Sequence, residues 1–157
     1  MKNLAHRHLM TLRLDVDFAQ TRRIGAIAAG YRGIALVTGG SFSGERLNGT
    51  VGSGADWYVI QPDGTLLIDV RLNLTSEDGV PIYLNYQGSM RGRCDAMARF
   101  AKGALLDPDE YSIVVNARLE SGDPRYAWLN ALTLVGTGTQ TPSGPIYEMF
   151  EIGQSLT

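Results

Sequence analysis

Three polar residues near the middle of the chain have side chains suited to proton transfer without a cofactor. Asp56 stands directly before Trp57, and an indole packed against a carboxyl group raises the pKa of that carboxyl by desolvation. Arg71 can hold an anionic group or an enolate oxygen, and Tyr83 can donate a hydrogen bond to a carbonyl. We therefore expect Asp56, Arg71 and Tyr83 to be catalytic. The alternative for Asp56 and Trp57 is a turn whose carboxylate binds backbone amides while the indole fills the core.

A second set of polar and aromatic side chains is expected to contact the substrate. Its members are Trp57, Asp69, Asn85, Arg118, Glu120, Trp128 and Asn130. Many of them recur at every second position, so in a strand each row projects from one face. The alternative for these rows is an ordinary solvent-exposed face. Asp69 and Arg71 could also form a buried ion pair, and Trp128 could be a core residue. Their residue types make directed hydrogen bonds, and this favours a polar-lined interior that orients a ligand.

The elements that must position these residues are short strands. Runs rich in Val, Ile, Leu, Thr and Tyr recur between glycine and proline turn signals, which is typical of an all-β barrel or sandwich. The predicted strands are 8–18, 32–38, 45–51, 57–61, 65–75, 80–92, 111–121, 127–138 and 145–153. Apolar spacing predicts one helix over 93–106. The fold class is therefore all-β and mainly antiparallel: a single, calycin-like β-barrel domain over residues 1–157 with one short helix.

The turn at Glu77-Asp78-Gly79 predicts that 65–75 and 80–92 form a hairpin. The pairs Asp69–Arg71 and Tyr83–Asn85 then become cross-strand neighbours. With Asp56 one strand earlier, we expect all five polar residues to converge on one cavity. If these polar rows face inward, the apolar rows face outward and need cover. The outward apolar rows would be Ile68-Val70-Leu72-Leu74 and Leu129-Ala131-Val135, which predicts a homodimer or higher homo-oligomer.

The chain lacks the patterns of metal and nucleotide sites. The histidines are His6 and His8, just before and at the very start of the first predicted strand, and Cys94 is the single cysteine, so no third zinc ligand accompanies them. The stretch Gly39–Gly44 is rich in glycine but lacks the Gly-Lys-Ser/Thr ending of a phosphate loop. A Ser-His-Asp triad needs a histidine among the strands, and no histidine follows His8 in the sequence. We expect no metal and no cofactor.

Composition excludes further classes of protein. The net charge is −2, and the 14 Lys and Arg residues are mostly scattered arginines, which argues against nucleic-acid and membrane-surface partners. The charged start, MKNLAHRHLM, is unlike a signal peptide, and one cysteine cannot form an intramolecular disulfide. A cytoplasmic location is expected.

Several short motifs resemble the UPF0311 family, also called DUF3237. They are Gly39-Gly40-x-Phe42-x-Gly44, Gly49-x-Val51, Gly54-Ala55-Asp56-Trp57, Asp63-Gly64, Asp69-x-Arg71, Thr75-x-Glu77-Asp78-Gly79, Ile82-Tyr83, Arg118-Leu119-Glu120-Ser121-Gly122 and Tyr126-Ala127-Trp128-Leu129-Asn130. The resemblance implies a compact β-barrel and carries no assigned activity. Leu119 departs from the family pattern, in which we expect an aromatic residue.

Two functions remain open at this point. The first is a cofactor-independent enzyme, an isomerase, hydratase, dehydratase or cyclase, acting on a small carbonyl-containing or aromatic metabolite. Asp56 would carry the proton, Arg71 would hold an anion or oxyanion, and Tyr83 and Asn85 would position the substrate. The second is a barrel that binds or carries a similar small molecule without changing it. An enzyme requires a titratable group with a shifted pKa facing the ligand, whereas a carrier does not.

Overall fold

The structure is a computed structural model that describes residues 3–154, except for the side chain of Cys94. Its strands are β1 (Ala5–Ile27), β2 (Gly30–Ser43), β3 (Gly49–Asp56), β4 (Val59–Ile60), β5 (Leu66–Ser76), β6 (Pro81–Gly92), β7 (Tyr111–Glu120), β8 (Leu134–Thr139) and β9 (Ile146–Gly153). The helical elements are α1 (Cys94–Ala101) and two 3₁₀ helices, η1 (Pro108–Glu110) and η2 (Pro124–Ala131).

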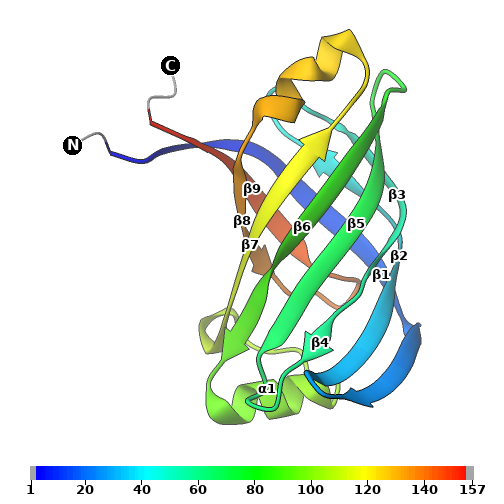
Figure 1. The fold of residues 1–157 in the computed structure, drawn as a ribbon, viewed down its shortest axis with the longest axis vertical. Helices are drawn as coiled ribbons and strands as arrows, with labels where there is room; N and C mark the ends of the chain where they lie inside the picture. Colours follow the sequence, from blue (N-terminus) through cyan, green and yellow to red (C-terminus); the bar gives the residue numbers. More distant parts are fainter. Residues whose placement is uncertain (1–2, 155–157) are drawn as a thin grey trace.

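The strands close into a barrel, as Figure 1 shows. Every neighbouring pair is antiparallel, and β1 pairs with both β2 and β9, which joins the two ends of the sheet. The short β4 continues β3 at the same position in the sheet, between β2 and β5. The predicted antiparallel β-barrel with one short α-helix is confirmed.

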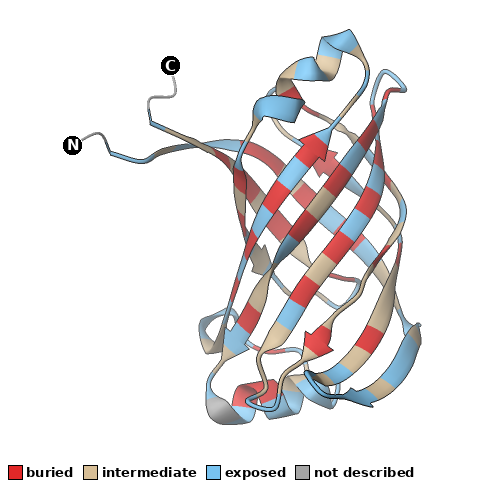
Figure 2. Cartoon of the chain, viewed as in Figure 1, coloured by how far each residue is buried: buried red, intermediate tan, exposed pale blue. Residues whose placement is uncertain are grey.

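The inside of the barrel is apolar, which reverses the orientation expected from the sequence. In β5, Ile68, Val70, Leu72 and Leu74 are buried, and the side chains between them lie on the outer face. The same alternation of buried and exposed residues runs along the other strands (Figure 2). The prediction of inward polar rows is wrong because the barrel interior is the place where this chain gathers its apolar side chains. The homo-oligomer stays a prediction, but the outward apolar rows that motivated it do not exist.

The barrel has a packed half and a hollow half. The packed half lies toward η2 (Figure 1) and is filled by buried side chains such as Leu12, Leu72, Leu84, Leu119 and Leu129. The other half lies toward α1 and contains a cavity of about 710 Å³. The change from packed half to hollow half occurs within single strands. In β5, for example, Leu72 and Leu74 lie in the packed half, whereas Ile68 and Val70 line the cavity.

Several segments differ from the predicted strands. The strand predicted over 45–51 is observed as β3, Gly49–Asp56, and the strand predicted over 57–61 shortens to β4. Residues 124–131 form η2, which begins after Asp123, whose carboxylate accepts a hydrogen bond from the Arg125 amide. Proline at the first helical position also favours this start, so Trp128 and Asn130 lie on a 3₁₀ helix rather than on a strand. The β1–β2 hairpin is longer than predicted and runs along the α1 end of the barrel (Figure 1).

Candidate functional site

The cavity in the hollow half lies inside the barrel and is partly open to solvent. Its wall is mostly apolar and comes from Leu14, Val16, Val37, Ile60, Leu66, Ile68, Val70, Met90, Phe100 and Ile113, among others. Toward α1 its lining reaches the half-exposed Phe18 and Leu105, on β1 and after α1. An apolar space of this volume with few polar groups is the usual form of a small-molecule site.

Asp56 reaches this cavity because a β-bulge changes the alternation of β3. Val51 pairs with Leu74 and faces inward, but three residues later Gly54 pairs with Leu72, only two residues along β5. The extra residue turns Gly54 and Asp56 toward the interior, where regular alternation would have placed residues 53 and 55. Gly54 is required here, because a Cβ atom would lie 2.2 Å from the carbonyl oxygen of Arg71.

The surroundings of Asp56 favour its neutral form. Burial raises the pKa of the Asp56 carboxyl from 3.8 to about 7, and the charge of Asp69 also raises this pKa. A hydrogen bond from the Asp69 amide to Asp56 Oδ1, at 3.0 Å, and the charge of Arg32 lower the pKa but do not offset the burial. A carboxyl group with such a pKa can both take up and release a proton near neutral pH.

Two buried tyrosines face the same cavity. The rings of Tyr86 and Tyr147 lie with their centroids 5.0 Å apart and tilted by 57°. Burial raises the pKa of both phenols, and the nearby charge of Asp56 raises both further. These phenols therefore keep their protons and can act as hydrogen-bond donors to a ligand oxygen.

A third tyrosine, Tyr58, lies on the cavity wall beside β2. A Cβ atom on Gly33 would lie 2.1 Å from the Tyr58 hydroxyl oxygen, so the absence of a side chain at Gly33 makes room for the phenol. Burial raises the pKa of Tyr58 as well. The cavity thus combines one carboxyl group that titrates near neutral pH with protonated phenols, an arrangement suited to acid–base chemistry.

Of the predicted site residues, only Asp56 lines this cavity. Arg71 and Asn85 are cross-strand partners, as predicted, but they lie on the outer face. The Arg71 guanidinium stands 3.8 Å from the Asp69 carboxylate and 5.3 Å from the centre of the Trp57 ring. The predicted convergence with Asp56 is therefore wrong, because residues on β5 and β6 that alternate with the buried apolar row must face outward.

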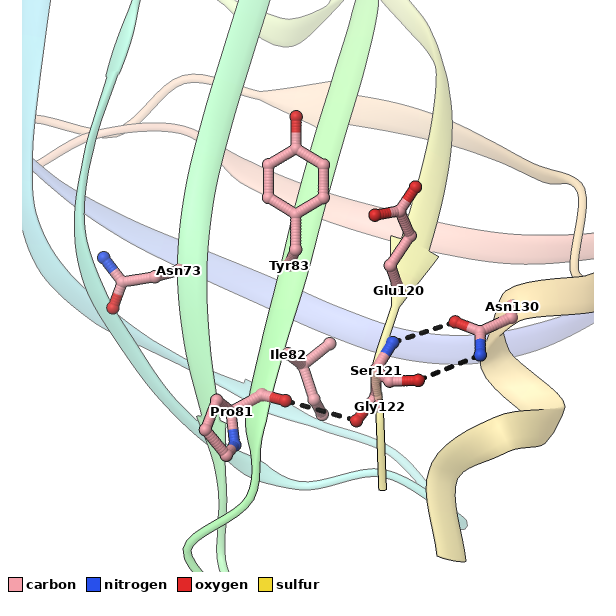
Figure 3. Close-up of a pocket in the computed structure, with 8 residues that line it drawn as sticks. All are labelled: Asn73, Pro81, Ile82, Tyr83, Glu120, Ser121, Gly122 and Asn130. Carbon is pink, nitrogen blue, oxygen red and sulfur yellow. Dashed lines mark hydrogen bonds between the residues drawn. The ribbon is translucent and has the colours of Figure 1, made fainter. Parts of the chain in front are cut away.

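Three other predicted residues meet at a shallow hollow on the outer face (Figure 3). Tyr83 and Glu120 are register partners on β6 and β7, and Asn130 comes from η2. Asn130 exchanges hydrogen bonds of 2.8 and 2.9 Å with the backbone of Ser121, whose hydroxyl donates to the Pro81 carbonyl at 3.2 Å. These contacts fix the β7–η2 connection, and neither Tyr83 nor Glu120 lies in the cavity with Asp56.

The remaining two predicted residues also lie outside the cavity. Arg118 is exposed on β7 and pairs with Asn85. Trp128 packs partly buried against the core at the η2 end, with the Arg46 guanidinium 4.6 Å from the centre of its ring. This agrees with the alternative reading of Trp128 as a core residue.

The sequence reasoning missed the cavity tyrosines. Tyr86 follows Ile82 and Leu84 at every second position, and Tyr147 precedes Met149 in the same way, so both belong to the buried rows. A tyrosine inside an otherwise aliphatic row was the available signal. The expectation that the polar rows face inward places both tyrosines on the outside of the barrel.

The described residues contain neither a metal-binding cluster nor a membrane-spanning helix. No three His, Cys, Asp or Glu side chains within residues 3–154 gather in a way that could hold a metal ion. In the same part of the chain, no helix is both long and apolar enough to cross a membrane.

Proteins of known sequence and structure resemble this chain over most of its length. A UPF0311 protein of Rhodopseudomonas palustris is 26% identical over a 149-residue alignment, which covers 90% of this chain and 97% of that protein. One from Clostridium acetobutylicum is 24% identical and covers 78% of each chain.

Among solved structures, a protein of unknown function from Rhodopseudomonas palustris has a TM-score of 0.88, 23% identity and coverage of 98% of this chain and 100% of its own. A beta-barrel like protein from Acinetobacter baumannii has a TM-score of 0.84, 30% identity and coverage of 96% and 97%. A structure described as an enzyme from Penicillium herquei has a TM-score of 0.72, 19% identity and coverage of 96% and 95%. The model of the family described as "Protein of unknown function (DUF3237)" matches residues 5–152. The chain therefore belongs to the DUF3237 family, which the curated relatives call UPF0311.

Proposed function

We propose that this barrel is a cofactor-independent enzyme in which Asp56 transfers a proton to or from a small, largely apolar molecule held in the cavity. The observation that carries the proposal is the position of Asp56, the sole acidic residue among the described residues that line the cavity. Its carboxyl group is held by a backbone amide in apolar surroundings, with a pKa raised to about 7 by burial. Such perturbed carboxyl groups inside a cavity are typical of catalytic acids and bases.

The geometry supports a simple sequence of proton movements. Ionised Asp56 accepts a proton from a carbon next to a carbonyl group or from a hydroxyl group of the substrate. Tyr86 and Tyr147 donate hydrogen bonds to the oxygen on which negative charge develops, the role first expected of Arg71. Protonated Asp56 then returns the proton to another carbon, which gives an isomerisation, or to a leaving hydroxyl group, which departs as water in a dehydration; a hydration runs the same steps in reverse. In a cyclisation, a hydroxyl oxygen that loses its proton to Asp56 bonds to an unsaturated carbon of the same molecule, and Asp56 gives the proton to the neighbouring carbon.

A likeness of fold adds modest support. The structure described as an enzyme from Penicillium herquei shares the fold at 19% identity. A barrel of this kind is thus compatible with catalysis, although the reaction must be argued from the cavity of this chain.

The second candidate is a carrier that binds a small molecule without changing it. It is favoured by the wall of the cavity, which is mostly aliphatic and aromatic and offers few polar groups. A carrier needs only shape and hydrogen bonds, so neutralising Asp56 would alter its affinity only modestly.

The test is incubation with a panel of small aromatic and carbonyl-containing compounds in D₂O, followed by NMR and mass spectrometry. The enzyme proposal expects deuterium incorporation or an isomeric, hydrated or cyclised product with the wild type. Asp56→Asn should abolish this turnover while keeping affinity within about tenfold. Glu148→Gln removes a carboxylate on β9 that does not line the cavity and should keep the activity.

Two outcomes contradict the enzyme proposal. Turnover that survives Asp56→Asn would move the chemistry away from this carboxyl group. Compounds bound with similar affinity by the wild type and Asp56→Asn, and left unlabelled by both, would instead identify a carrier.

A further inference from the structure

The lining of the cavity changes character from its depth to its α1 end. Asp56 and the buried tyrosines lie among aliphatic side chains, whereas two basic residues, Arg23 and Lys102, line the end near α1. Arg23 comes from β1 in the β1–β2 hairpin, and Lys102 directly follows α1. Both are exposed, and within residues 3–154 neither forms an ion pair with a carboxylate.

Strand register places Arg23 beside the Tyr58 phenol. Arg23 is the cross-strand partner of Gly33, and the Tyr58 hydroxyl lies where a Gly33 side chain would be. Residues in register on neighbouring antiparallel strands project from the same face. Arg23 and Tyr58 therefore meet on the cavity side of β2, and the charge of Arg23 is close enough to lower the pKa of the phenol, although burial raises that pKa by more.

A guanidinium group next to a protonated phenol is a pair of donors suited to an anion. The guanidinium offers several N–H donors in a planar fork and the phenol offers one O–H donor. Lys102 adds a second positive charge to the lining at this end. The two charges would attract an anionic group of a ligand but would not stabilise the binding of an apolar group.

We infer that the ligand is amphipathic, with an apolar or aromatic body inside the barrel and an anionic group bound at the α1 end by Arg23, Tyr58 and Lys102. The inference deepens the proposed function and rests on it for the identity of the site. Asp56 pairs with Ala35, and Arg23 pairs with Gly33 two residues along the same strand. Strand spacing then separates the Cα atoms of Asp56 and Arg23 by roughly 10–12 Å, about the length of a two-ring aromatic acid.

The test uses two fluorescent probes with the same aromatic body. 1-Anilinonaphthalene-8-sulfonate carries an anionic group, and N-phenyl-1-naphthylamine lacks only that sulfonate. The wild type should bind the sulfonate more tightly than the neutral probe, and added salt should reduce the difference. Arg23→Gln should weaken binding of the sulfonate by about three- to tenfold and leave the neutral probe within about twofold.

Matched variants keep the result specific. Arg22→Gln removes an equal charge from the adjacent residue of β1, which does not line the cavity, and should leave both affinities unchanged. Ile68→Trp fills the cavity and should abolish binding of both probes, which shows that they report on this space. Because the readout is binding, it is independent of turnover by Asp56.

Three results would overturn the inference. One is equal affinity of the wild type for the two probes, or no binding of either. Another is an Arg23→Gln variant that binds the sulfonate as tightly as the wild type does. The third is equal weakening by Arg22→Gln, which would indicate general electrostatics in place of a built subsite.

Discussion

At the scale of single residues, the proposed function depends on Asp56. It is held in an apolar wall, accepts one backbone hydrogen bond, and has a pKa raised to about 7 by burial. A carboxyl group placed in this way reduces the stability of the fold at neutral pH, and such a loss is typical of functional sites. Asp56 and Trp57 were both singled out from the sequence, but the indole lies outside the cavity wall, so burial among aliphatic residues perturbs the carboxyl.

The first prediction is a dependence of stability on pH that Asp56→Asn removes. Asp56 ionises near pH 3.8 in the unfolded chain and near 7 in the folded one, so the folded state binds more protons between these values. The contribution of Asp56 to the free energy of unfolding is greatest below pH 3.8 and is lost as the pH rises through 7. Asp56→Asn should therefore gain about 2–4 kcal/mol relative to the wild type between pH 4 and pH 8. Urea denaturation of both proteins at the two pH values measures this gain, and an equal difference at both would contradict the raised pKa.

At the scale of elements, the faces of the strands decide which residues can act together. The alternation in 65–75 and 80–92, and the pairing of Arg71 with Asn85, were predictable from the sequence. The sequence did not predict which face of these strands points inward. A polar row and an apolar row have the same period, and only closure of the barrel decides which row is enclosed. The β3 bulge was also hidden, since it depends on the register between β3 and β5. Without it, alternation from Val51 would turn Asp56 outward.

The second prediction concerns the ion pairs that join three elements at the packed end. Glu151 on β9 is buried and accepts hydrogen bonds from Arg7 on β1, at 2.8 Å, and from Arg46 in the β2–β3 connection. Burial opposes ionisation of Glu151, but the two arginines hold its pKa below the usual value. Glu151→Gln should lower the free energy of unfolding by about 1–3 kcal/mol at pH 7.

The matched control for Glu151 is Glu148 on the same strand. Its side chain is 44% exposed and bonds to Thr11 at 2.8 Å and His8 at 2.6 Å. Glu148→Gln should change the free energy of unfolding by less than about 1 kcal/mol. Chemical denaturation of both variants measures the difference, and equal losses would show that burial of Glu151 is not what makes its ion pairs matter.

At the scale of the whole molecule, the fold divides a single barrel into a packed core and a cavity. Composition, turn spacing and alternation were enough to predict the antiparallel barrel and its short helix, because these follow from local patterns. The cavity was not predictable in the same way, since its tyrosines come from the β3–β4 connection, from β6 and from β9, which are far apart in the chain. Only closure brings Tyr58, Tyr86 and Tyr147 to one space.

The third prediction follows from this division. Leu84→Ala removes a fully buried side chain from the packed half and should reduce the free energy of unfolding by about 3–5 kcal/mol, because a new void is left behind. Ile68→Ala enlarges a space that already exists and should lose only about 1–2 kcal/mol. Urea denaturation distinguishes the two halves, and similar losses at both positions would mean that the α1 half is as closely packed as the other.

The most direct test of the central claim is a titration of the carboxyl carbons by ¹³C NMR. Asp56 is assigned as the aspartate resonance that disappears in Asp56→Asn. The account predicts that this carboxyl titrates with a midpoint about 7, as expected for a buried acid in the cavity wall. An Asp56 midpoint near the ordinary value of 3.8 would contradict it, because the carboxyl would then be solvated and almost fully ionised near neutral pH, without the protonated form that can act as an acid.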